Sequence, residues 1–185
     1  MKPILPDYTI PATEWMMTTN TPPETFSLPG EVVEGLAAYA HAARIVVGSA
    51  RFGVSILSED LEAGSYGVPS FADAVKNLVL LQRHAKLRVL VRNSRTAASR
   101  SHGLVELARI VTSRIEFRDL PVDRNPGVAE MVIADGRVLL ERRHSGDLQG
   151  FLYTQSPPTA RERQRSFDAL WDEALPSQEF RRLGI

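Results

Sequence analysis

The sequence predicts an α/β fold in which a mixed β-sheet is flanked by helices. Short β-rich segments alternate along the chain with segments whose apolar residues recur every three or four positions. Two further β-rich runs are joined by Asp135-Gly136, a dipeptide typical of a type I′ hairpin turn. Helices between strands, together with a hairpin, indicate a mixed sheet on which helices pack.

Each element is assigned from its local pattern. Helices are expected where apolar residues have helical spacing, and strands where short runs are rich in β-branched residues. Gly53 ends the first helix, Ser70 is the expected N-cap of the second, and residues 92–99 form a polar turn. The expected helices cover residues 31–51, 71–82, 101–111 and 159–174. The expected strands cover residues 54–57, 86–91, 114–117, two runs within 130–142, and 150–154, and a short tail ends the chain.

Two parts are expected in the chain, an extended N-terminal arm over residues 1–30 and one α/β domain over residues 31–185. With 185 residues, of which 43% are apolar, the chain is long enough for one such domain with its own core. The arm contains six prolines and no sustained hydrophobic period. Its apolar residues, among them Trp15 and Met16, are too many for a plain solvated tail. The arm therefore either wraps its own domain or crosses to a partner subunit.

The amino-acid composition excludes several kinds of catalytic and metal-binding site. The absence of cysteine excludes disulfides, thiolate catalysis and cysteine-ligated metals. The four histidines lack a metal-binding spacing such as HExxH, so we expect no metal and no cofactor. The apolar runs are too short to cross a bilayer, and no basic, apolar leader follows Met1. We therefore expect no membrane insertion and a cytoplasmic location.

Charge is unevenly distributed although the formal net charge is zero. Residues 83–118, the basic island, hold nine Lys and Arg against two Asp and Glu, whereas residues 1–82 hold four against nine. Nearly all the cations are arginine, whose planar, forked guanidinium suits phosphate and carboxylate groups. Genomic base composition produces the same arginine bias and is the plainer interpretation.

The segment GVAEMVIADG, residues 127–136, gives the main indication of function. Together with the element order, it resembles one half of a phospholipase D-like domain, whose members carry an HxKxxxxD motif on a strand, usually followed by glycine. Laid on this segment, the motif places Val128 at the histidine, Glu130 at the lysine and Asp135 at the aspartate. The resemblance implies that the nucleophile and the phosphate-stabilising lysine are missing, so no catalytic residue is expected.

The same resemblance implies roles for the two remaining polar positions. Glu130 would put a negative charge where a phosphate would sit, a repulsion on the order of 1–4 kcal/mol. Asp135 would keep a structural role in the hairpin turn. Active members build their site between two halves, so a single half implies a homodimer or a pair with a related protein.

Three segments point to a more particular group: ILSEDLEAGSYG, HGLVELARIVTSRIEFR and FDALWDEALPSQEFRRL. They are similar to phospholipase D-like domains often attached to GNAT-type acetyltransferases, and the similarity covers residues 36–183. It implies that an acetyltransferase is a candidate partner.

Candidate ligand-binding residues come mainly from two segments. One follows the first strand, where open sheets commonly place ligand loops, and the other leads into the third helix. The candidates are Ser58, Asp60, Arg92, Asn93, Arg95, Arg100, His102 and Glu130. A charged surface loop and a capped helix start are the plainer interpretations of the two segments.

These observations predict a non-catalytic interaction or ligand-binding module. Its degenerate cleft or the basic island would hold a small anion, a nucleic acid or another protein. One alternative is a divergent phosphodiesterase or phosphatase in which His102 or His144 supplies the nucleophile. Another is a regulatory partner of an acetyltransferase. Ser145, His144 and Asp147 are too close in sequence for a catalytic triad, and a polar turn explains that segment.

Overall fold

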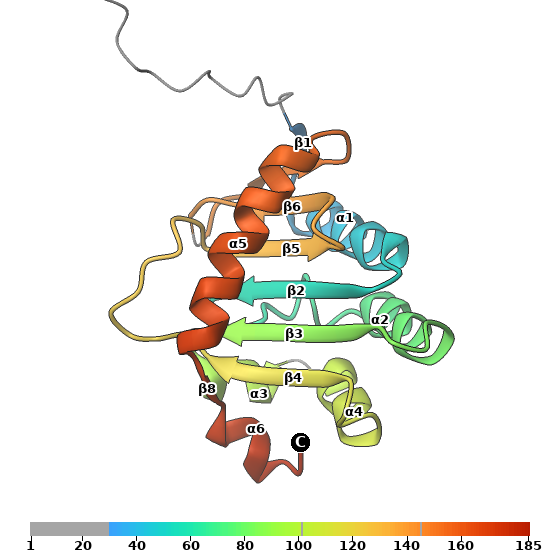
Figure 1. The fold of residues 1–185 in the computed structure, drawn as a ribbon, viewed down its shortest axis with the longest axis vertical. Coiled ribbons are helices and arrows are strands. Elements are labelled where there is room, and N and C mark those ends of the chain that lie inside the picture. Colours follow the sequence, from blue (N-terminus) through green and yellow to red (C-terminus); the bar gives the residue numbers. More distant parts are fainter. Residues whose placement is uncertain (1–29, 101, 145) are drawn as a thin grey trace, which may run out of the picture.

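An eight-stranded mixed sheet organises the fold (Figure 1). The computed structural model describes residues 30–100, 102–144 and 146–185. Strands β2, β3 and β4 run parallel, and every other neighbouring pair is antiparallel. Across the sheet, the order is β1 (Glu31–Glu34), β7 (Gln149–Tyr153), β6 (Val138–Arg142), β5 (Glu130–Ala134), β2 (Gly53–Ser58), β3 (Lys86–Val91), β4 (Ile115–Asp119) and β8 (Leu175–Pro176). The predicted fold class is confirmed.

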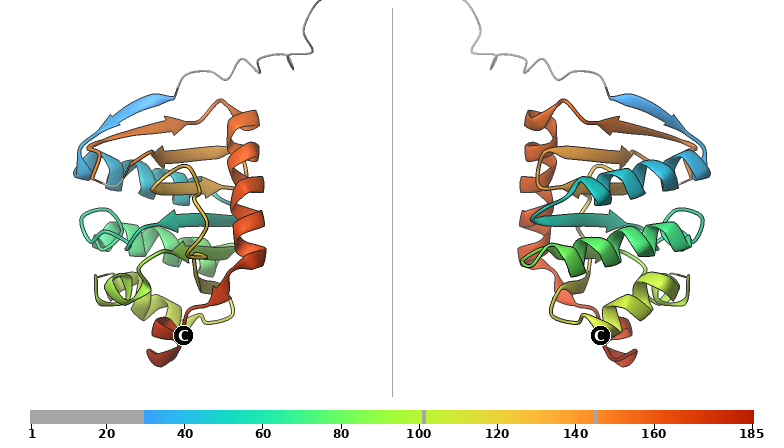
Figure 2. Two further views of the ribbon diagram at one scale, coloured as in Figure 1. Left: turned by 90° about the vertical axis from the view of Figure 1, so that its left-hand side faces the viewer. Right: turned by 90° about the vertical axis from the view of Figure 1, so that its right-hand side faces the viewer.

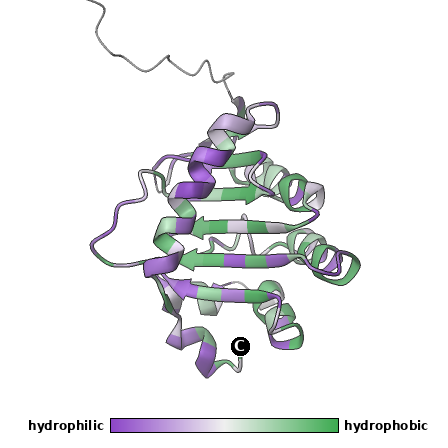
Figure 3. Cartoon of the chain, in the orientation of Figure 1, coloured by the Kyte–Doolittle hydropathy of each residue, from purple (hydrophilic) through white to green (hydrophobic). Residues whose placement is uncertain are grey.

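Helices cover both faces of this sheet (Figure 2). Helices α1, α2 and α4 lie on one face, while α5 crosses the strands on the other. Hydrophobic residues dominate the strands, whereas the outer side of α5 is largely hydrophilic (Figure 3). The helices are α1 (Leu36–Ser49), α2 (Pro69–Leu81), α3 (Ser94–Arg100), α4 (His102–Ile110), α5 (Pro157–Glu173) and α6 (Gln178–Arg182).

Strand alternation divides the core into two clusters. Ile56 and Val132 belong to the cluster beneath α1 and α2, whereas their neighbours Leu57 and Ile133 pack in the cluster that contains Phe167 of α5. Successive side chains of a strand point to opposite faces of a sheet, so these central strands are buried on both sides. The result is a three-layer arrangement, helices over sheet over helix.

The prediction that the first helix begins at residue 31 was wrong. Residues 31–34 form β1, which pairs with β7 at the edge of the sheet. Gly35 separates this strand from α1, because it has a φ of 84° and its amide donates to the carbonyl oxygen of Leu148 at 2.7 Å. The helical spacing of apolar residues thus extends by coincidence into residues 31–34, which pair with β7 in the sheet.

Two other local predictions were also wrong. Residues 94–100 form α3 instead of a polar turn, because the side-chain oxygen of Asn93 accepts a hydrogen bond from the Thr96 amide, as an N-cap does. Ser70 does not cap α2, which begins one residue earlier at Pro69. Proline suits the first helical position because its missing amide hydrogen would have no partner there.

The predicted hairpin turn is confirmed and has a further role. Asp135 and Gly136 have φ values of 53° and 63°, the positive values that a type I′ turn requires. The Asp135 carboxylate also accepts hydrogen bonds from three successive backbone amides, those of Arg51, Phe52 and Gly53, at 2.8–2.9 Å. It therefore ties the hairpin to the junction between α1 and β2.

Strand directions define two edges of the sheet. The carboxyl edge is where β2, β3 and β4 end and where β5 begins, and the amino edge is the opposite one. Residues 1–29 of the predicted N-terminal arm, which covers residues 1–30, lie outside the described residues, so its extended form stays a prediction. Within the described ranges, no helix is long and apolar enough to span a membrane.

We predict that Asp135→Ala lowers the free energy of unfolding by about 2–3 kcal/mol, because three amides lose a charged acceptor. Urea denaturation followed by circular dichroism measures this loss. Asp172→Ala, at an exposed position of α5, is the matched control and should change stability by less than about 0.5 kcal/mol. Equal effects of the two substitutions would contradict the anchoring role of Asp135.

Candidate functional site

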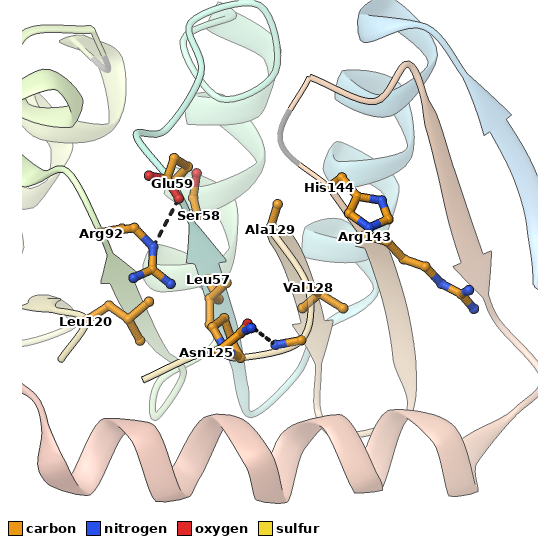
Figure 4. A pocket seen from close by; sticks show the side chains of 12 residues that line it. Leu57, Ser58, Glu59, Arg92, Leu120, Asn125, Val128, Ala129, Arg143 and His144 are labelled. Atoms are coloured by element: carbon orange, nitrogen blue, oxygen red, sulfur yellow. Dashed lines mark hydrogen bonds and ion pairs between the residues drawn. The ribbon is translucent and has the colours of Figure 1, made fainter. Parts of the chain in front are cut away.

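A pocket of about 350 Å³ lies at the carboxyl edge (Figure 4). Its wall is built from the ends of β2, β3, β4 and β6 and from the loop that leads into β5. Open α/β sheets commonly bind ligands at this edge, where loops leave the carboxyl ends of parallel strands. Its lining residues with polar side chains are Ser58, Glu59, Arg92, Asn125, Arg143 and His144.

Charges around the pocket are mostly paired. Nε of Arg92 lies 3.1 Å from Glu59, and Nη2 of the same guanidinium donates to the carbonyl oxygen of Arg124 at 3.3 Å. Nδ1 of His144 lies 3.0 Å from the carboxylate of Asp147. The Arg143 side chain extends away from the pocket and lies over the Phe151 ring (Figure 4).

The two motif positions that the family uses for chemistry do not share the pocket. Val128 lines it, but its side chain is 4% exposed and belongs to the cluster beneath α5. Glu130 does not line it, because its carboxyl turns into the protein on the other face of the sheet. The predicted repulsion between Glu130 and a phosphate in the pocket therefore does not apply directly.

A buried hydrogen-bond network holds the Glu130 carboxyl. Its Oε1 accepts from the Glu59 amide at 3.1 Å, and its Oε2 accepts from the Tyr66 hydroxyl at 2.9 Å. Arg142 lies nearby with its guanidinium paired to Glu62 at 3.0 Å. The backbone amide of Glu59 donates to Glu130, and its side-chain carboxylate pairs with Arg92 in the pocket. The buried network therefore holds this part of the pocket wall in place.

Burial changes the acidity of this network. It raises the pKa of Glu130 to about 7, and hydrogen bonds from Ser58, Tyr66 and the Glu59 amide, with the charge of Arg142, offset only part of the effect. Burial likewise raises the pKa of the Tyr66 hydroxyl, and the nearby Glu130 charge adds to this. At neutral pH, Glu130 is thus a mixture of neutral and ionised forms.

The remaining predicted site residues divide between the pocket and its surroundings. Ser58 and Arg92 line the pocket, whereas Asp60 and Arg100 form an ion pair beside it. Asn93 caps α3, and Arg95 lies exposed in that helix. His102 is the first residue of α4. Among the described side chains of the predicted groove around His102, Arg92 lines this pocket.

Ion pairs from distant segments neutralise much of the basic island. Arg88 pairs with Asp168, Arg92 with Glu59, and Arg100 with Asp60. Arg109 and Arg118 pair with acids of the island itself, and Arg114 donates to the carbonyl oxygens of Val79 and Gln82. A count of charges along the sequence therefore overstates the cationic character of this segment in the fold.

The predicted ligand-binding residues did not include Glu59 and Arg143, and His144 was considered only as a turn residue or as the nucleophile of the alternative phosphodiesterase. Glu59 was passed over although both of its neighbours were chosen, and its place directly after a buried strand was the available signal. The position of Arg143 and His144 depends on the pairing of β6 with β5, which brings them opposite the loop before Glu130. Among the described residues, no group of three or more His, Asp or Glu side chains is arranged to hold a metal ion.

We predict that Glu130→Gln makes stability less dependent on pH. The folded pKa of Glu130 lies above its ordinary value of 4.5, so its stabilising contribution is complete below that value and is lost as pH rises through 7. Between pH 5 and 8.5, the wild-type free energy of unfolding should fall by about 3 kcal/mol more than that of the variant. Urea titrations at both pH values measure this difference, and parallel losses in the two proteins would refute it.

Solved structures with this fold are distant in sequence. One is TrmBL2, an archaeal chromatin protein described as showing a novel mode of DNA binding, with a TM-score of 0.59 at 13% identity. The match covers 83% of this chain but 56% of TrmBL2, so this chain spans little more than half of that protein. Another is NucT from Helicobacter pylori, with a TM-score of 0.51, 11% identity and coverage of 77% of this chain and 92% of NucT. The likeness to NucT, like that to TrmBL2, shows a shared fold.

Comparison of sequences assigns the chain to a family. No curated protein matches the chain significantly. One family pattern matches residues 35–183, which include every described strand except β1 and all six helices. The chain therefore belongs to the family described as Domain of unknown function (DUF7931).

Proposed function

We propose that this protein is a non-catalytic phospholipase D-like module that binds a phosphate-bearing ligand, with nucleic acid as the ligand class, in the carboxyl-edge pocket. The observation that carries the proposal is the combination found at this edge. The pocket is present and Arg92 reaches it, but Val128 occupies the position of the nucleophile and the Glu130 carboxyl is buried.

Arg92 is suited to exchange its present partner for a phosphate. Its ion pair with Glu59 is partly solvated, since the two side chains are 34% and 38% exposed. Such pairs contribute roughly 0–1 kcal/mol, so a phosphate that takes the guanidinium fork has little to displace. Glu59 then acts as a competitor for Arg92.

The structural neighbours support nucleic acid as the ligand class. TrmBL2 is described as a DNA-binding chromatin protein, and NucT is a phospholipase D-family nuclease. Both names therefore point to proteins that act on or bind nucleic acid. The missing motif residues favour binding over cleavage in the present chain.

We predict opposite effects of two substitutions on the binding of a thymidine dinucleotide, measured by isothermal titration calorimetry. Arg92→Ala should weaken binding about tenfold, because it removes the charge-assisted hydrogen bonds to phosphate. Glu59→Gln should strengthen binding, because it removes the carboxylate that competes for Arg92. It keeps the backbone amide that donates a hydrogen bond to Glu130. A purely structural role of the pair would make both variants bind less well.

Arg181→Ala is the matched control, because Arg181 is an exposed arginine of α6, far in sequence from the pocket. Inorganic phosphate serves as a second probe and separates recognition of the phosphate group from recognition of the nucleoside. Unchanged binding of both probes by Arg92→Ala would refute the proposal.

A second candidate function rests on His144. Asp147 holds Nδ1 of this histidine, which leaves Nε2 as the nitrogen available for nucleophilic attack, and His144 lines the pocket. The side chain is 80% exposed, however, and Asp147 also accepts from the His144 backbone amide, as in a polar turn. A divergent phosphodiesterase is therefore the weaker proposal.

We predict no cleavage of bis(p-nitrophenyl) phosphate by the wild-type protein above the level of a His144→Ala variant. The release of p-nitrophenol is measured by absorbance. Cleavage that disappears in His144→Ala but persists in His41→Ala, an exposed histidine of α1, would favour the phosphodiesterase. His102→Ala tests the other predicted nucleophile in the same assay.

Three finer predictions belong to the same proposal. A homodimer or a pair with a related protein, one domain over residues 31–185 and a cytoplasmic location are consistent with a binding module. Sedimentation of the full chain tests the dimer. Co-purification tests the predicted acetyltransferase partner, which is supported by resemblance alone.

A further inference from the structure

A second pocket, of about 500 Å³, lies at the amino edge of the sheet and is separate from the one at the carboxyl edge. Its wall combines the start of β2, the start of β3, the hairpin turn and the inner side of α5. No predicted site residue and no position of the phospholipase D-type nucleophile or lysine lies in it. The side chains at its rim and base include Phe52, Ser55, Lys86, Arg88 and Asp168.

The base of this pocket is a fixed polar layer. Ser55 accepts hydrogen bonds from Arg88 and from Gln164, each at 3.1 Å, and Asp168 accepts from the same two groups at 2.7 and 2.9 Å. The Arg88 guanidinium also lies over the Phe167 ring, 5.1 Å from its centroid. These contacts hold the base in one arrangement before any ligand arrives.

Positive charge exceeds negative charge around the rim. Lys86 lines the pocket, Arg51 precedes Phe52, and Arg137 follows the hairpin turn, and all three are exposed. Among the described residues, none of these three side chains has an ion-pair or hydrogen-bond partner. The two acids of the pocket are already engaged, since Asp135 accepts three backbone amides and Asp168 pairs with Arg88. The rim therefore attracts anions.

Phe52 adds an aromatic surface beside these cations. Its side chain is 77% exposed, although a phenylalanine loses favourable free energy when its ring stays in water. Its position is nevertheless fixed, because its backbone amide donates to Asp135 at 2.9 Å. The ring thus stands at the rim of a cationic pocket on a rigid backbone.

We propose that the amino-edge pocket binds single-stranded nucleic acid, with a base stacked on Phe52 and the backbone phosphates held by Lys86 and the adjacent arginines. Cationic grooves with exposed aromatic rings are the arrangement by which proteins bind single strands with little sequence preference. A duplex fits less well, because its bases are already stacked on one another and cannot cover the ring. The proposal is independent of Arg92 and of the carboxyl-edge pocket.

The test measures fluorescence anisotropy of a labelled twenty-nucleotide oligo(dT) with the full chain. Phe52→Ala should weaken binding about 5- to 100-fold, the range that one base stacked on an aromatic ring contributes. Lys86→Ala should weaken binding and lower the slope of log affinity against log salt concentration by about 1. Phe52→Trp should retain the affinity, which separates stacking from mere disruption of the loop.

Matched controls lie elsewhere in the chain. Lys76→Ala removes an exposed lysine of α2, and Val122→Ala removes the side chain of an exposed apolar residue in the loop between β4 and β5, so neither should alter binding. Circular dichroism and urea midpoints establish that each variant is folded. A blunt duplex of the same length should bind more weakly than the single strand, and Phe52→Ala should affect it little.

The outcomes separate this proposal from the proposed function. Loss of oligo(dT) binding in Phe52→Ala and Lys86→Ala, but not in Arg92→Ala, supports a binding site at the amino edge. Loss of oligo(dT) binding in Arg92→Ala alone overturns it and supports binding at the carboxyl-edge pocket instead. Binding that is unchanged in Phe52→Ala, or equal for duplex and single strand, also overturns it. An acidic peptide that binds through Lys86 while oligo(dT) does not would assign the rim to a protein partner and overturn the proposal.

Discussion

The antiparallel pairing of β5 with β2 is the constraint on which both pockets depend. This pairing inserts the hairpin beside the parallel strands, with Leu57 opposite Met131 and Val54 opposite Ala134. The loop before β5 thereby reaches the carboxyl edge, and the turn after it reaches the amino edge. The Asp135 carboxylate fixes the register from one end through three amides, and Glu130 fixes it from the other through the Glu59 amide. A slip by one residue would break both contacts and exchange the two faces of the strand.

Periodicity predicted the general architecture because most elements bury a regular apolar face. It failed where tertiary contacts decide the outcome. Residues 31–34 have apolar spacing compatible with a helix, but Gly35 and the free edge of β7 make them a strand. Residues 94–100 look polar, yet the Asn93 cap and the burial of Ala97 make them helical. Neither the cap nor the edge is visible in a local count of residue types.

The candidate sites were less predictable than the fold, for electrostatic reasons. The motif alignment identified Val128 and Glu130 as the informative positions. The structure adds that the Glu130 carboxyl is buried outside the pocket, whereas Arg92 lines it. The basic island is less cationic in the fold than its sequence indicates, because acids such as Asp168 come from segments far along the chain, whereas Lys86 stays exposed. Conversely, Phe52 had no signal in the sequence, where a phenylalanine beside a glycine indicates burial as readily as exposure.

The buried Glu130 also limits how this protein can evolve. A lysine at this position would face the Glu59 amide and the Tyr66 hydroxyl, which now donate to Glu130, and a lysine ammonium has no lone pair to accept from either. It would also bring a second cation close to Arg142, whose side chain is 5% exposed. A lysine at position 130 is therefore compatible with this fold only if several surrounding residues change with it. The network around Glu130 therefore ties the identity of residue 130 to the side chains that surround it.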